Sequence, residues 1–260
     1  MTTYLVVGAG PSGLACAVAL ARTSGARIVL IDRIPVTGGE SGWADPHVRR
    51  LTAQAETAGV ELRLGVIATR WQDHRLLLIS PLGVEWLPGD HLFYAGGRRP
   101  ATQADLGITG RRPAGVLPAT VVEHLLTTRV ALWKRPLIIG DDTWAARLAA
   151  GLRHTGGTVL GLGDVGWADE RFPEGRIEVL GTHRVEGVRV HSGADLTHIT
   201  CDGIVLAADA RPNRNVDGAL FDDAGGVTFV QPLTVDGAAD RAAEASTAAR
   251  SWIHAQGETA

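Results

Sequence analysis

The residues best suited to chemistry stand near the start of the chain, in the run GAGPSG at residues 8–13. This run matches the pattern GxGxxG. It follows a short apolar stretch at residues 4–7 and opens a helical pattern at residues 11–24, and an acidic residue, Asp32, comes after a second apolar stretch. A strand, a glycine turn, a helix and an acid, in this order and within about 30 residues, are typical of a dinucleotide-binding unit.

Each part of this pattern has a physical task. The first glycine permits a tight turn, the second lets the backbone approach a diphosphate, and the third lets the helix pack closely on the strand. The helix N-terminus offers N–H groups and a partial positive charge. Asp32 can accept hydrogen bonds from an adenosine ribose and would repel a 2′-phosphate, so FAD or NAD is favoured over NADP. The predicted contacts within the turn are Gly8, Gly10, Pro11, Ser12 and Gly13.

The elements that must position this site form alternating strand and helix patterns. A helix is expected at residues 47–58, a strand at 60–64 and a small antiparallel meander at 68–92. A second strand–helix–strand pattern occupies residues 137–162, and an alanine-rich helix is expected at 238–254. Consecutive units of this kind predict an α/β fold built on doubly wound parallel sheets.

Composition excludes several classes of function. The chain carries 25 basic and 28 acidic residues, a net charge of −3, so it has no net basic field to attract nucleic acid or an anionic membrane. The two cysteines, Cys16 and Cys201, lie far apart, which excludes a CxxC redox pair and a cysteine-based zinc site. The nine histidines show no metal-binding spacing, so we expect no metal.

The chain also lacks the sequence signals of a membrane or secreted protein. No apolar stretch reaches the roughly 18 residues that a membrane span needs. The N-terminal residues lack the basic segment of a signal peptide and run directly into the first expected strand. A soluble, cytoplasmic protein is therefore expected.

Several segments together resemble a known group of proteins; they read LVVGAGPSGLACAVALA, LIDR, TGGE, HVRRLTAQAETAGVELRLG, FYAGG and LGITGRRPAGVLPATVVEHLL. The chain resembles the two-dinucleotide-domain flavoproteins of the pyridine nucleotide-disulfide oxidoreductase superfamily. It is most similar to the FAD-binding α-subunits of hetero-oligomeric amine and amino-acid dehydrogenases, of the opine, hydroxyproline, proline and sarcosine type. The resemblance covers most of residues 4–126 and, more loosely, residues 135–254.

The resemblance implies FAD as the cofactor and a characteristic division of the chain. A Rossmann-like FAD domain would comprise residues 1–117 and 213–260. A smaller NAD(P)-binding-like α/β domain would be inserted at residues 118–212, and we expect it to be degenerate. The C-terminal segment would then return to complete the FAD domain.

The resemblance also assigns positions around the cofactor. Asp32 would hold the adenosine ribose, Arg33 would flank the adenine, and the backbone of Ala68 would face the adenine edge. The glycine loop after the second strand would line the path toward the flavin, a turn after a later strand would lie beside the cofactor, and a C-terminal glutamine stands where the family has an aspartate for the ribityl chain. These further contacts are Gly38, Gly39, Glu40, Ala95, Gly96 and Gln231.

The second glycine motif departs from the family pattern. Residues 140–145 read GDDTWA where GxGxxG is expected, so Asp142 replaces the glycine that should face a diphosphate. A carboxylate about 4 Å from a diphosphate charge costs on the order of 4 kcal/mol at an effective dielectric constant near 20. Asp141 and Asp142 are instead well suited to cap a helix. We therefore expect weak or absent nicotinamide binding in the inserted domain.

The leading hypothesis is an FAD-dependent oxidoreductase subunit, in which electrons pass between FAD and a partner subunit during oxidation of a small amine or amino acid. The resemblance implies a hetero-oligomer with another flavoprotein, an iron–sulfur subunit or both, with no nucleic acid or membrane partner. No catalytic residue is assigned, because hydride chemistry would belong to the flavin. Two alternatives remain open: a stand-alone NAD(P)H-dependent flavin reductase, and a non-catalytic scaffold subunit with FAD structural or lost.

Overall fold

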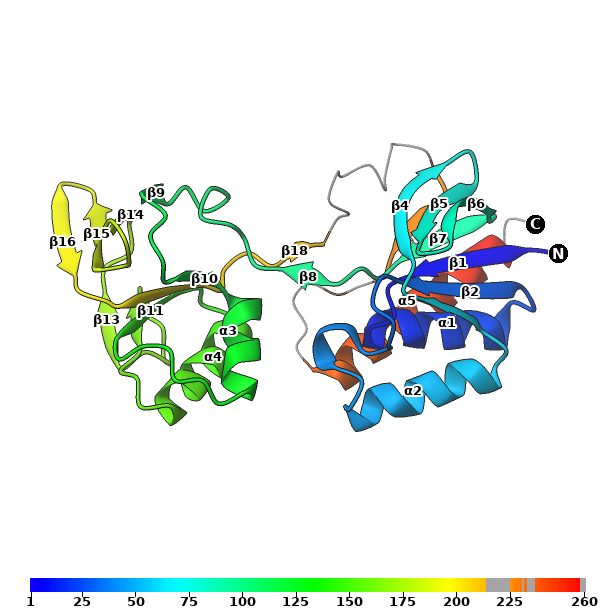
Figure 1. Cartoon of the computed structure of the whole chain (residues 1–260), viewed down its shortest axis with the longest axis horizontal. Helices are drawn as coiled ribbons and strands as arrows, with labels where there is room; N and C mark the ends of the chain where they lie inside the picture. Colours follow the sequence, from blue (N-terminus) through cyan, green and yellow to red (C-terminus); the bar gives the residue numbers. More distant parts are fainter. Residues whose placement is uncertain (214–224, 231, 233–236, 258–260) are drawn as a thin grey trace. The chain divides into compact units, whose positions relative to one another are not determined.

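The computed structural model describes residues 1–213, 225–230, 232 and 237–257. The chain forms two compact units, each with its own core (Figure 1). Unit 1 comprises residues 1–98 and 212–260, and unit 2 comprises residues 99–211. The chain passes from one unit to the other at two short paired strands, β8 (Arg98–Arg99) and β18 (Arg211–Pro212).

Unit 1 is built on a five-stranded parallel sheet with the strand order β19-β7-β1-β2-β3. Three helices cover one face of this sheet, and a three-stranded antiparallel meander covers the other (Figure 1). The sheet strands are β1 (Thr3–Val7), β2 (Arg27–Asp32), β3 (Glu61–Leu64), β7 (His91–Tyr94) and β19 (Val227–Phe229). The helices are α1 (Pro11–Thr23), α2 (Pro46–Thr57) and α5 (Ala238–Gly257), and the meander is β4 (Ile67–Gln72), β5 (Arg75–Ser80) and β6 (Gly83–Pro88).

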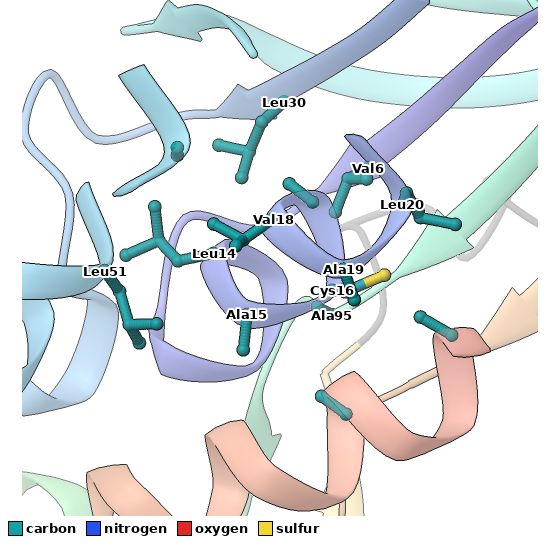
Figure 2. Close-up of a cluster of buried hydrophobic side chains, with 14 of the residues drawn as sticks. Val6, Leu14, Ala15, Cys16, Val18, Ala19, Leu20, Leu30, Leu51 and Ala95 are labelled. Carbon is teal, nitrogen blue, oxygen red and sulfur yellow. The ribbon is translucent and has the colours of Figure 1, made fainter. Parts of the chain in front are cut away.

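Helix α1 lies at the centre of the unit 1 core. Its residues from Pro11 to Leu20 are all buried, because the sheet, α2 and α5 pack around it. Figure 2 shows Leu14 and Val18 of α1 among side chains of the sheet and α2. Cys16 belongs to this cluster, and burial raises the pKa of its thiol, as expected for a core cysteine. The rigid packing of α1 fixes the glycine turn that precedes it.

Strand alternation divides the unit 1 sheet between two hydrophobic cores. On β1, Val6 faces the helices and Leu5 faces the meander. The meander contributes the fully buried side chains of Trp71, Leu76 and Leu78 to the second core. The sheet is therefore covered on both faces, as parallel sheets require.

Unit 2 combines a parallel sheet with a second, mainly antiparallel sheet. The first has the order β10-β17-β11-β12-β13 and is parallel throughout, and the second has the order β16-β15-β14-β9. The parallel strands are β10 (Val116–Pro118), β11 (Pro136–Ile139), β12 (Leu160–Leu162), β13 (Glu170–Phe172) and β17 (Gly203–Leu206). The remaining elements are β9 (Thr109–Gly110), β14 (Arg176–Leu180), β15 (Gly187–Ser192), β16 (Asp195–Ile199), α3 (Ala119–Thr127) and α4 (Thr143–His154).

The expected α/β class with parallel sheets is confirmed, and one boundary differs from expectation. We expected residues 99–117 to belong to the first domain, whereas the structure places them in unit 2. The reason is strand pairing: β9 joins β14, and β10 joins β17 through Leu117 and its neighbours. Among the described residues, no helix has the length and apolar character needed to cross a bilayer.

Candidate functional site

Two of the three glycines in the first turn are required by packing. Gly8 follows β1 with φ at +108°, and a Cβ built on it would lie 2.2 Å from the carbonyl oxygen of Ala95. A Cβ on Gly13 would lie 1.7 Å from the carbonyl oxygen of Gly8. No side chain fits at either position, because backbone atoms occupy the space. These glycines allow β1, the turn and α1 to pack closely.

Gly10 is different, because the protein itself does not require a glycine there. Its φ is −76°, an ordinary value for any residue. The nearest atom to a Cβ built on it would be the carbonyl oxygen of Gly38 at 3.9 Å, which is normal contact. No other atom of the described residues comes within 4 Å of this position, so they leave the space in front of the turn open. The chain has glycine at a position where a larger residue would also fit. This is the pattern expected where a ligand comes close to the backbone.

Within the described residues, no side chain caps the N-terminus of α1. Gly10 is the N-cap residue and supplies no side-chain hydrogen bond, Pro11 follows it, and the first turn contains no acidic residue. The positive end of the helix dipole is therefore not neutralised from within the helix, which favours an anion. The buried hydroxyl of Ser12 donates to the carbonyl oxygen of Arg241 at 3.4 Å, so this side chain anchors α5.

Asp32 lies at the end of β2, directly beside the turn. Its Oδ2 accepts a hydrogen bond from the backbone N–H of Ala9 at 2.6 Å, and its Oδ1 accepts one from Ile34 at 2.8 Å. Both carboxylate oxygens are thus held in place, and each keeps a further acceptor site. The remaining acceptor capacity is compatible with the ribose contact that the sequence predicts for this residue, which stays a prediction. It also ties the acid to the glycine turn by a direct bond.

The loop carrying Gly38, Gly39 and Glu40 lies against the turn. The N–H of Gly38 donates to the carbonyl oxygen of Ala9 at 2.8 Å, and a Cβ on Gly39 would approach the Cα of Gly10 to 3.3 Å. Glu40 belongs to the short 3-10 helix η1 (Gly39–Ser41) and pairs with Arg241 at 2.9 Å. Its carboxylate is therefore engaged in an ion pair.

Arg241 is a residue that the sequence reasoning missed. It lies in the first turns of α5, and besides pairing with Glu40 it donates to the Oγ of Ser41 at 2.9 Å. The contact joins segments 200 residues apart and fastens α5 to the loop beside the candidate site. The alanine-rich sequence around Arg241 contained no signal for it, because an ion pair between distant segments is a property of the tertiary fold.

The remaining predicted contacts surround the turn on two sides. Arg33 is exposed next to Asp32, and Ala68 lies in β4, where the preceding Val66 donates its N–H to the carbonyl oxygen of Asp32 at 2.9 Å. The structure thus brings Ala68 to the same end of β2 as the acid. On the other side, Ala95 donates its N–H to the carbonyl oxygen of Val7 at 2.7 Å.

Gly96 continues the turn next to Ala95. Asn213 bonds there through its Nδ2, which donates to the carbonyl oxygen of Gly96 at 3.3 Å. The backbone oxygen of Asn213 accepts from the Tyr94 hydroxyl at 2.5 Å. Sequence reasoning did not assign Asn213 or Tyr94 to the site region. Gln231, the predicted ribityl contact, lies outside the described residues.

In unit 2 the corresponding turn has a closed N-terminus. Gly140 follows β11 with φ at +151°, and a Cβ on it would lie 2.7 Å from the carbonyl oxygen of Ala207. Asp142 is the N-cap of α4, and its Oδ1 accepts a hydrogen bond from the N–H of Ala145 at 3.0 Å. The prediction that Asp142 caps the helix is confirmed. One of the donors that a diphosphate would need is already occupied by a carboxylate.

A separate groove of about 370 Å³ lies beside the loop after β2. Segments of that loop, α2 and β3 line it, with Val36 and the largely exposed Trp43 on its rim. The Oγ1 atoms of Thr37 and Thr52 share a hydrogen bond of 2.8 Å at this place. None of the predicted dinucleotide contacts lines the groove.

The other reactive residue types offer no further redox centre in the part of the chain that the structure describes. Cys201 is 2% exposed, and burial together with the neighbouring charge of Asp202 raises the pKa of its thiol to about 12. The thiol is therefore protonated at neutral pH. Among the described residues, no three His, Cys, Asp or Glu side chains converge as metal ligands do.

Comparison with known proteins finds similarity that includes the first turn. Residues 6–55 match the family model described as an NAD(P)-binding Rossmann-like domain. The chain is 26% identical over 228 residues to a probable fumarate reductase, Ifc3, of Shewanella frigidimarina strain NCIMB 400, covering 80% of this chain and 38% of that protein.

Solved structures share the fold over most of the chain. L-proline dehydrogenase from P. horikoshii is similar with a TM-score of 0.65 at 14% identity, over 98% of this chain and 56% of that one. A pyridine nucleotide-disulfide family oxidoreductase from Enterococcus faecalis V583 is similar with a TM-score of 0.67 at 15% identity. The match covers 96% of this chain and 68% of that one. The chain has a Rossmann-like α/β fold. It spans little more than a third of the fumarate reductase and just over half of the proline dehydrogenase chain.

Proposed function

We propose that this chain is an FAD-dependent oxidoreductase subunit that holds FAD at the glycine turn of unit 1. The observation that carries the proposal is the open space at Gly10, where neither the backbone angle nor packing demands a glycine. A diphosphate that approaches the backbone of the turn would explain why this position is glycine. The anion would meet the uncapped N-terminus of α1.

The residues present fit the adenosine diphosphate part of FAD. Asp32 is held beside the turn with acceptor capacity for a ribose, and it disfavours a 2′-phosphate through charge repulsion. Ala68 offers backbone near the same end of β2. The ion pair between Glu40 and Arg241 holds the loop and α5 together beside the turn. These features favour a cofactor with a free ribose, and the sequence resemblance favours FAD over NAD.

When bound, FAD supplies the two-electron chemistry. The chain's own residues bind and orient it: the turn at residues 8–13 positions the diphosphate, Asp32 positions the ribose, and the segment at Ala95 and Gly96 closes the turn from the side of β7. Gly8 and Gly13 hold these parts close together by packing. No proton-transfer residue enters the proposal.

We propose that electrons pass between the bound FAD and another subunit. Two features of this chain support that view. Its two cysteines lie far apart in sequence and are both buried, so they provide no disulfide relay, and the capped N-terminus of α4 disfavours a nicotinamide dinucleotide in unit 2. The resemblance to the α-subunits of amine and amino-acid dehydrogenases favours a hetero-oligomer that oxidises a small amine or amino acid. The partner would be another flavoprotein, an iron–sulfur subunit or both.

The test begins with the absorption spectrum of the purified full chain and its titration with FAD. Stoichiometric flavin, retained or taken up, is expected. A colourless chain that takes up no FAD contradicts the proposal and favours a scaffold. The chain is then assayed alone and with co-expressed products of neighbouring genes, using a dye acceptor and a panel of amines and amino acids. Turnover that requires the partner is expected, and full turnover by the isolated chain with NADH would favour the stand-alone reductase.

A further inference from the structure

The outer face of the meander in unit 1 exposes a group of large apolar side chains. Leu82 stands in the turn between β5 and β6 and is 99% exposed, and Val84 is 67% exposed. The group, which we call the hairpin face, comprises the exposed Ile67, Ile79, Leu82, Val84 and Trp86 together with the half-buried Leu77. Contiguous exposed apolar side chains on a small sheet mark an interaction surface.

Strand register places these side chains on one face. Ile79 pairs with Ile67 on β4 and with Val84 on β6, which forms one row across the sheet. Two residues further from the turn, Leu77 pairs with Trp86 in a second row. Successive side chains of a strand alternate between faces, so the intervening Leu78 points to the buried core. The hairpin face is therefore additional to the apolar residues that the fold needs.

The side chains of the hairpin face change in chemical type along the hairpin. Aliphatic side chains occupy the turn and the first row, and the tryptophan stands about 7 Å further back, at 3.3–3.4 Å per residue. Arg75 follows in the next row of this face, with its guanidinium 5.5 Å from the centre of the Trp86 ring. Arg70 is exposed in the row of Trp86.

We propose that the hairpin face inserts shallowly into an anionic lipid surface. The order aliphatic, tryptophan, arginine is the order in which these side chains meet the acyl boundary, the interface and the phosphate headgroups. The spacing of about 7 Å agrees with the 5–10 Å depth at which peripheral apolar segments lie. An interface with another protein would favour apolar side chains at its centre and polar ones around the rim, without an order by depth.

The charges on the hairpin face favour contact with an anionic lipid surface. Arg70 and Arg75 lie on the face itself, and the acid of β6, Glu85, pairs with Arg63 at 2.9 Å. The expectation that the chain avoids membranes came from its net charge of −3, which describes the whole molecule and not this hairpin. Insertion would depend mainly on the apolar turn, with the two arginines adding attraction to anionic headgroups. This inference does not rest on the proposed flavin chemistry.

The test is co-sedimentation of the full chain with vesicles of phosphatidylcholine alone and of equal parts phosphatidylcholine and phosphatidylglycerol. We expect binding to the anionic vesicles that weakens as salt is raised. Leu82→Ser should lower the partition coefficient about tenfold or more, because a fully exposed leucine is the residue that inserts. The matched control is Leu196→Ser, which changes an exposed leucine of β16 in unit 2 and should leave binding unchanged.

A second measurement reports insertion directly. Both native cysteines are buried, so Leu82→Cys offers one exposed thiol for an environment-sensitive fluorophore, and Leu196→Cys is its control. A blue shift with anionic vesicles at position 82 alone is expected. Absence of vesicle binding, or equal binding by Leu82→Ser and wild type, overturns the proposal. Concentration-dependent self-association that Leu82→Ser abolishes, without vesicle binding, would assign the face to a protein contact and also overturn it.

Discussion

The N-termini of α1 and α4 share the same strand–turn–helix geometry, but the first lacks a side-chain cap and the second has one. Each follows a parallel strand and a glycine with positive φ, and each glycine lies against a backbone carbonyl of a neighbouring strand end, Ala95 for Gly8 and Ala207 for Gly140. They diverge two residues later. Gly10 leaves the α1 terminus open, whereas Asp142 folds back onto its own helix.

This difference shows how one residue decides whether a helix donor is satisfied within the chain or is left for a ligand. In unit 2 a helix donor is satisfied within the chain, at a gain of about 1 kcal/mol for a side-chain cap. In unit 1 the corresponding stabilisation is absent, and the donors remain available for an anion. A shared strand–turn–helix fold therefore does not imply a shared function.

The largest effect is expected from Gly13→Ala. The new Cβ would lie 1.7 Å from the carbonyl oxygen of Gly8, so the turn and α1 must separate. We expect the free energy of unfolding of unit 1 to fall by about 3 kcal/mol or more. Gly166→Ala is the control, because its Cβ meets no atom within 4 Å. Chemical denaturation of both variants measures the difference, and equal midpoints would show that the close packing of this turn is unimportant.

Much of unit 1 could be predicted from sequence because its signals are local. The pattern GxGxxG, the apolar stretches and Asp32 predicted β1, α1 and β2, and the alternating residues around Pro81 and Gly83 predicted the meander. Each signal depends on residues near one another in the chain, where period and turn chemistry determine structure.

The parts that could not be predicted depend on distant contacts. The pairing of β10 with β17, which assigns residues 99–117 to unit 2, joins strands separated by more than 80 residues. The connection between β14 and β15 lacks a tight-turn signal, and the ion pair of Arg241 with Glu40 joins the two separate segments of unit 1. The openness of the space at Gly10 is likewise a property of the assembled fold.

The second prediction is that the stability of unit 1 depends on pH through His91. Burial, with a smaller contribution from the charge of His74, lowers the pKa of His91 in β7 from 6.5 to about 4. Its Nε2 also bonds to the Oγ1 of Thr228 at 2.9 Å. Below pH 6.5 the unfolded chain takes up a proton that the folded chain accepts only near pH 4. Unit 1 should therefore lose stability as pH falls between these values, by about 2 kcal/mol in total.

Hydrogen exchange resolved by segment measures this loss. Faster exchange in unit 1 between pH 6.5 and 4, after correction for the intrinsic rate, is expected. His91→Gln keeps a side chain that can hydrogen-bond and should remove the dependence. A dependence that persists in this variant would assign the effect to other groups.

The third prediction tests the capped terminus. Asp142→Ala removes the acceptor for the N–H of Ala145 and should destabilise unit 2 by about 1 kcal/mol. Asp142→Gly should in addition make NADH binding measurable by calorimetry, because the repelling carboxylate is gone. Micromolar NADH binding by the unaltered chain would contradict the interpretation of this terminus as closed.

The central claim is that the open space at Gly10 exists for FAD, and Gly10→Ala tests it most directly. The new Cβ meets only ordinary contact at 3.9 Å from Gly38, so the free energy of unfolding should change by less than about 1 kcal/mol. The same methyl group would stand against the diphosphate and should weaken FAD binding about ten- to a hundredfold. Calorimetric titration of both proteins with FAD, beside their unfolding curves, is the measurement. Intact stability with this loss of affinity is the predicted result, and unchanged FAD affinity in Gly10→Ala would contradict the account.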